Sequence, residues 1–150
     1  MINNDQELKK ALAGLSIAEQ RELGAQFVAS VSSLNPDPLI ERALKTASDK
    51  KYSDSDLNEI YLRIKSLSIK TYTSCGDDAD WSAQAAHFVA SAAKVCLTPE
   101  KQLDNNNNLA WKCAMQARMA KNCAMMESDE DIIDNEAQKQ YVISNNYLSH

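Results

Sequence analysis

Two segments of the chain, Trp81 to Leu97 and Leu109 to Met126, are built largely from small residues. Ala, Ser and Cys supply 16 of their 35 positions. Small side chains let helix axes approach toward the short end of the usual range of about 8 to 10 Å. The first segment also has only one charged side chain, Lys94, so little of its surface can face water. The two segments therefore predict a pair of closely packed helices at the centre of the fold.

The rest of the chain is also typical of helices, because residues that break them are scarce. The 150 residues include three Gly and three Pro, and the stretches between them are rich in good helix formers. A chain of this length has the usual size of one domain. We therefore expect an all-α fold, a single-domain helical bundle over residues 1–150 with about six to seven helices and the two small-residue helices central.

Capping and breaking residues mark the helix boundaries in the first half. Ser16 and Glu19 have the spacing of a capping box, which predicts a helix from Ile17 to Ser33. A shorter helix is expected from Asp5 to Ala13. Pro38 is placed to start a third helix, because the first helical turn tolerates a missing N–H group.

Two amphipathic patterns predict the other helices. Apolar side chains recur every three or four residues from Leu57 to Thr71, which predicts a helix with one buried stripe. A second such pattern runs from Ile132 to Leu148. Ser128 and Asp131 precede it with capping spacing, so we expect the last helix to begin there.

The composition also bears on the environment of the protein. The first ten residues are polar and lack the apolar core of a signal peptide, and no run is as long as the roughly 18 apolar residues of a membrane span. We expect a soluble, cytoplasmic protein that does not bind membranes. Cys75, Cys96, Cys113 and Cys123 have no zinc-ligand spacing, and we interpret them as reduced and buried.

Motifs for metals, cofactors and catalysis are weak. Asp104, Asn106 and Asn108 match the first ligands of a calcium-binding loop, but Leu109 and Met115 stand where Gly and Glu are needed. The chain has no nucleophile-elbow, zinc-protease or nucleotide-binding motif. We therefore predict no metal site and no cofactor, and we favour a protein that is not an enzyme.

A sulfur-rich stripe lies on the second small-residue segment. Met115, Met119, Cys123 and Met126 share one face of the expected helix. Thioether and thiol groups can bind Cu(I), but Met is also a flexible filler of protein cores. We interpret the stripe as part of the core.

Charge is distributed unevenly between the two halves of the chain. Residues 1–75 hold ten acidic and ten basic side chains, whereas residues 76–150 hold eleven acidic and six basic ones. The acids of the second half gather in two segments that flank the small-residue helices, with Asp77, Asp78 and Asp80 in one and Glu127, Asp129, Glu130 and Asp131 in the other. Such a surface repels nucleic acid and attracts a basic protein. We therefore predict that these seven residues bind a basic protein partner.

A family resemblance points the same way. The segments DWSAQAAHFVASAAKVC, LAWKCAMQARMAKNC and EAQKQYVISNNYL, within Asp80 to Leu148, resemble bacterial alanine-rich helical immunity proteins of the Imm5-like group. These proteins are the antidote halves of toxin systems. The resemblance implies a bacterial protein that neutralises a cognate toxin by binding it, without chemistry of its own.

Two other functions remain open from the sequence. Trp81, His87 and Trp111 could line a cavity between helices, which would make the protein a small-molecule binder or an enzyme. Alternatively, Tyr61, Tyr72 or the last helix could form the seam of a structural homodimer.

Overall fold

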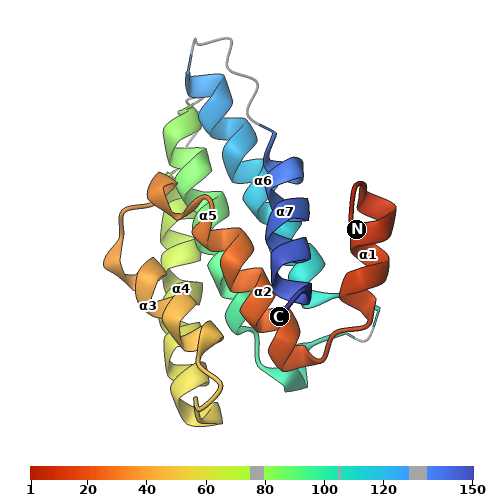
Figure 1. Ribbon diagram of the computed structural model, residues 1–150. Helices are drawn as coiled ribbons and strands as arrows, with labels where there is room; N and C mark the ends of the chain where they lie inside the picture. The colour runs from red at the N-terminus through yellow and green to blue at the C-terminus, as the bar shows by residue number, and fades with distance from the viewer. Residues whose placement is uncertain (75–79, 105, 129–134) are drawn as a thin grey trace.

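The two small-residue segments form the centre of the bundle, as predicted. The computed structural model describes residues 1–74, 80–104, 106–128 and 135–150, which hold seven α-helices and no β-strand. Helices α5 (Trp81–Leu97) and α6 (Leu109–Glu127) run antiparallel and pack along each other (Figure 1). Helix α5 also packs against α2, α3 and α4, so its small side chains are enclosed on several sides.

The first two helices begin where their capping residues predict. Helix α1 (Asp5–Ala13) starts after Asn4, whose side chain accepts the N–H of Glu7. Helix α2 (Ile17–Ala29) starts with the complete capping box of Ser16 and Glu19. It ends four residues before the expected Ser33, and a short 3₁₀ helix, η1 (Ser32–Leu34), follows. The Ser32 hydroxyl donates to the carbonyl of Ala29, so a side chain supplies the bond that a further helical turn would have made.

Helices α3 and α4 form a hairpin that covers one side of α5. Helix α3 (Pro38–Ser48) has Asp37 as its N-cap and the proline in its first turn. Helix α4 (Asp54–Ser74) follows after a short connection and packs against both α3 and α5. The amphipathic pattern predicted for this helix is confirmed, because Leu57, Ile60 and Ile64 are buried.

The last helix begins later than expected. Helix α7 (Glu136–Leu148) starts after Asn135, whose side chain accepts the N–H of Gln138. The predicted start at Ser128 is wrong, because this residue follows the last turn of α6 and its N–H donates to the carbonyl of Ala124. The other half of that predicted cap, Asp131, lies outside the described residues.

Three elements meet most closely where α2 crosses the α5–α6 pair. A Cβ atom placed on Gly24 of α2 would lie 3.0 Å from the Cys113 Sγ and 3.4 Å from the Cys96 Sγ. The two sulfur atoms are 3.1 Å apart, and both cysteines are buried as free thiols. A side chain at Gly24 therefore fits only if the Cys113 side chain gives way. The three described cysteines are buried, as predicted. Cys75 lies outside the described residues.

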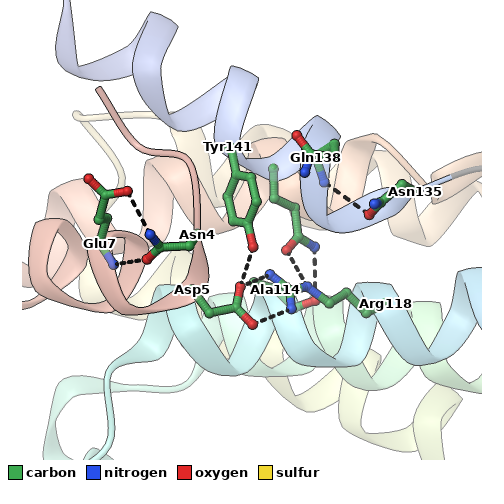
Figure 2. A network of polar contacts seen from close by, with 9 residues as sticks. Asn4, Asp5, Glu7, Ala114, Arg118, Asn135, Gln138 and Tyr141 are labelled. Carbon is green, nitrogen blue, oxygen red and sulfur yellow. Dashed lines mark hydrogen bonds and ion pairs between the residues drawn. The ribbon is translucent and has the colours of Figure 1, made fainter.

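A polar network fastens α1 and α7 to α6 (Figure 2). The Arg118 guanidinium donates two hydrogen bonds to the Asp5 carboxylate, at 2.7 and 3.0 Å, and a third to the Gln140 side chain at 2.8 Å. The Tyr141 hydroxyl donates to the same carboxylate at 2.7 Å. The Arg118 hydrogen bonds hold the pKa of Asp5 down at about 2, although burial opposes them.

No helix in the described part of the chain is long and apolar enough to cross a lipid bilayer.

The contact at Gly24 yields a stability prediction. Gly24→Ala is expected to lower the free energy of unfolding by about 1–2 kcal/mol, because overpacking outweighs the higher helix propensity of Ala. Gly14→Ala is the matched control, since its Cβ would meet only the Ala11 carbonyl at an ordinary 3.6 Å. Urea denaturation followed by circular dichroism measures both variants. Equal stability of Gly24→Ala and the wild type would show that the three helices are not in close contact here.

The Asp5 network yields a pH-dependent prediction. The folded pKa of Asp5, about 2, lies below the ordinary 3.8, so its stabilisation is complete above pH 4 and disappears as the pH falls toward 2. Because the carboxylate is half-exposed and solvent screens it, we expect Asp5→Asn to cost about 1 kcal/mol at neutral pH. Urea denaturation of both proteins from pH 7 to pH 2 should show this difference shrinking to zero. A difference that is constant with pH would exclude the ionic contribution.

Candidate functional site

Two of the seven predicted acidic site residues lie in the described part of the chain. Asp80 is the N-cap of α5 and accepts the N–H of Ala83, and Glu127 is the last residue of α6. Because α5 and α6 are antiparallel, the start of α5 and the end of α6 lie at the same end of the bundle (Figure 1). The other five, Asp77, Asp78, Asp129, Glu130 and Asp131, lie outside the described residues.

Large apolar side chains are exposed at this same end. Helix α4 also ends here, and its last turns expose Ile69 by 58% and Tyr72 by 70%. Met126, in the last turn of α6, is 60% exposed. These residues lie at the same end of the bundle as Asp80 and Glu127, and we call this end, with Ile69, Tyr72, Asp80, Met126 and Glu127, the acidic end.

The exposure of methionines corrects one prediction. The sulfur-rich stripe of α6 was expected to fill the core, yet Met119 and Met126 are exposed. Only Cys123 of the stripe is buried. Met115 is partly buried against a second cluster of buried side chains, which includes Leu8, Leu12 and Phe27 and which we call the smaller core. The prediction for this stripe is wrong because α6 packs on α5, α2 and α7 through its Ala and Cys residues instead. Among the described residues, no group of His, Cys, Asp and Glu could hold a metal ion.

His87 lies next to the acidic end on α5. Its ring packs against Tyr72 and Phe88, with centroids 5.6 and 5.7 Å away, and its Nδ1 is 3.0 Å from the Thr71 hydroxyl. Burial lowers the pKa of the imidazole below its ordinary 6.5, and the charge of Lys94 lowers it further. A hydrogen bond with the backbone of Ser68 opposes this shift. His87 is therefore a neutral part of the packing between α4 and α5 at physiological pH.

The structure does not bring Trp81, His87 and Trp111 together around one cavity. Trp81 opens α5 and Trp111 lies in the first turn of α6, so antiparallel packing separates them by about the length of α5, roughly 25 Å. Trp111 belongs to the smaller core, where Lys9 and Arg118 lie over its ring at 4.6 and 5.6 Å. His87 and Trp111 thus contact different parts of the bundle.

A cavity of about 720 Å³ lies at the end of the bundle opposite to the acidic end. It is enclosed by the start of α2, by Tyr52 and the start of α4, and by residues 99–102, which include the 3₁₀ helix η2 (Glu100–Gln102). Arg21 of α2 lines this cavity and is only 2% exposed. We call it the Arg21 cleft.

Arg21 was not singled out from the sequence. Its Nη1 donates to the backbone carbonyl of Cys96 at 2.8 Å, and its Nε has no hydrogen-bond partner. No acidic side chain of the described residues forms an ion pair with it. A signal was present, because Arg21 occupies the same helix face as Gly24, Ala25 and Val28, which are all buried. A charged residue within such an apolar stripe requires a partner or a ligand.

The environment of His87 yields a titration prediction. Because its folded pKa lies below 6.5, its contribution to stability is fully present above pH 6.5 and is lost as the pH falls from there through the lower folded pKa. We expect the His87 ring resonances in an NMR titration to change with a midpoint below 6.5. A midpoint at or above 6.5 would contradict the burial of the ring.

Comparisons with models of protein families, with curated proteins and with solved structures find no match for this chain.

Proposed function

We propose that this protein is a non-enzymatic binding protein that neutralises a basic protein toxin by contact through its acidic end. The observation that carries this proposal is the exposure of Tyr72, Ile69 and Met126 at the same end of the bundle as Asp80 and Glu127. The resemblance to alanine-rich helical immunity proteins supplies the class of partner.

The composition of the acidic end suits a protein interface. Aromatic residues and Met are enriched in the cores of interfaces, and Tyr is a frequent energetic hot spot. Tyr72 is preorganised for this role, because its ring rests on His87 while most of its surface remains open. Acidic side chains around such anchors would speed the encounter with a basic partner.

A basic partner suits this surface better than a second copy of the chain. A symmetric dimer brings the same surface of both copies together, so Asp80 and Glu127 would face like charges. Tyr61, an expected member of a dimer seam, is also buried, with its hydroxyl 3.3 Å from the Gln102 side chain. These two observations favour a heterologous complex.

The test uses the protein encoded by the neighbouring gene. Co-expression is expected to protect cells from that protein and to give a stable complex on a sizing column. Tyr72→Ala should weaken the complex by about 2 kcal/mol or more in isothermal titration calorimetry, as expected for a central anchor. Val142→Ala is the matched control, since Val142 is 58% exposed on α7, outside the acidic end.

A separate measurement tests the role of the acidic side chains in binding. Asp80→Asn keeps an N-capping side chain but removes the charge, so we expect slower association and a weaker dependence on salt, with little change in dissociation. Lack of both protection and complex formation would refute the proposed function. Equal losses of binding affinity in Tyr72→Ala and Val142→Ala would refute the assignment of the binding surface to the acidic end.

A further inference from the structure

The Arg21 cleft contains a buried cation that the protein does not neutralise. A buried guanidinium without a partner costs several kcal/mol. The Cys96 carbonyl, near the C-terminal end of α5, provides one hydrogen bond, and the negative end of that helix provides part of the missing charge. The Arg21 Nε and Nη2 atoms, however, make no hydrogen bond to the described residues. The protein alone therefore leaves one edge of the guanidinium unsatisfied.

This free edge has the geometry that a carboxylate requires. An arginine side chain presents five N–H groups in a planar fork, and two parallel ones can bind both oxygens of a carboxylate. With Nη1 held by Cys96, the Nε–Nη2 edge is the one left for such a pair. Because the Nε atom is itself buried, the Arg21 side chain must turn toward the cleft for a carboxylate to reach this edge. The first turn of α2 also lines the cleft, and the positive end of its helix dipole favours a negative charge there.

The rest of the cleft holds two carboxylates, one ammonium group, that of Lys101, and an apolar wall. Asp54, in the first turn of α4, and Glu100, in η2, both line it and are exposed. Tyr52 and Leu57 supply apolar surface beside them. The cleft thus combines a buried cation, two accessible carboxylates, the Lys101 ammonium group and an apolar surface within one cavity.

We propose that the Arg21 cleft binds a free amino acid with an apolar side chain. The ligand carboxylate pairs with the Nε–Nη2 edge of Arg21, its ammonium group lies near Asp54 and Glu100, and its side chain packs against Tyr52 and Leu57. The cavity volume, about 720 Å³, falls in the range typical of small-molecule sites. Inorganic phosphate is disfavoured, because its second negative charge would face the two carboxylates, and the Lys101 ammonium group offsets only one of them. The site is independent of the proposed function, since it lies at the other end of the bundle.

The first experiment compares four probes by NMR and calorimetry. L-phenylalanine carries both charges, 3-phenylpropionate lacks the ammonium group, 2-phenylethylamine lacks the carboxylate, and inorganic phosphate is the competing anion. We expect L-phenylalanine to shift the Arg21 Nε–Hε resonance and to bind at least about tenfold more tightly than the other three. No shift of this resonance at millimolar concentrations, or tighter binding of phosphate, would overturn the proposal.

Two variants test separately the binding of the ligand's carboxylate by Arg21 and of its ammonium group by Asp54. Arg21→Gln should abolish binding of both L-phenylalanine and 3-phenylpropionate. Asp54→Asn, at an exposed position, should weaken the binding of L-phenylalanine several-fold and leave the binding of 3-phenylpropionate unchanged. This test remains valid even when Arg21→Gln fails to fold. Glu41→Gln is the matched control, because this exposed acid lies on α3 outside the cleft. Equal binding of L-phenylalanine to Asp54→Asn and the wild type, together with equal affinities for the two carboxylate probes, would overturn the amino-acid assignment.

Discussion

The close approach of three helices at Gly24 is the constraint on which the rest of the bundle depends. The Cys96 and Cys113 sulfur atoms occupy the space that a side chain on α2 would need. This contact allows α5 to be covered by α2 and α6 together, while α3 and α4 cover its remaining surface. It also brings Arg21, one helical turn before Gly24, within hydrogen-bonding distance of the end of α5. The packing of the core and the unsatisfied guanidinium thus have one geometric origin.

Local chemistry explains which helices were predictable. Asp5–Ala13 and Trp81–Leu97 have the predicted bounds, because short-range capping by Asn4 and Asp80 decides where such helices start. The last helix was placed too early at Ser128, since Asn135 offers an equivalent cap closer to the helix. A capping motif shows where a helix can start, whereas tertiary packing decides which candidate start is used.

The candidate sites were less predictable, because they depend on contacts between distant residues. The buried Arg21 side chain donates a hydrogen bond to the carbonyl of Cys96, which is 75 positions away in the chain. Trp81 and Trp111, expected with His87 to line one cavity, both lie near helix starts, and helices that are consecutive and antiparallel place their starts at opposite ends. The same antiparallel geometry brings the start of α5 and the end of α6 to one end of the bundle, which is why Asp80 and Glu127, far apart in sequence, lie at that end.

The pairing of α1 with α7 has a consequence for the kinetics of folding. The backbone of Ile2 exchanges hydrogen bonds of 2.9 and 3.1 Å with the side chain of Asn145, 143 residues away. By contrast, α4, α5 and α6 pack against neighbours that follow directly in the chain. Closing a long loop costs more conformational entropy than closing a short one, and contacts of high sequence separation slow folding. We therefore expect the central hairpins to form early and the joining of the two terminal helices to complete the native state.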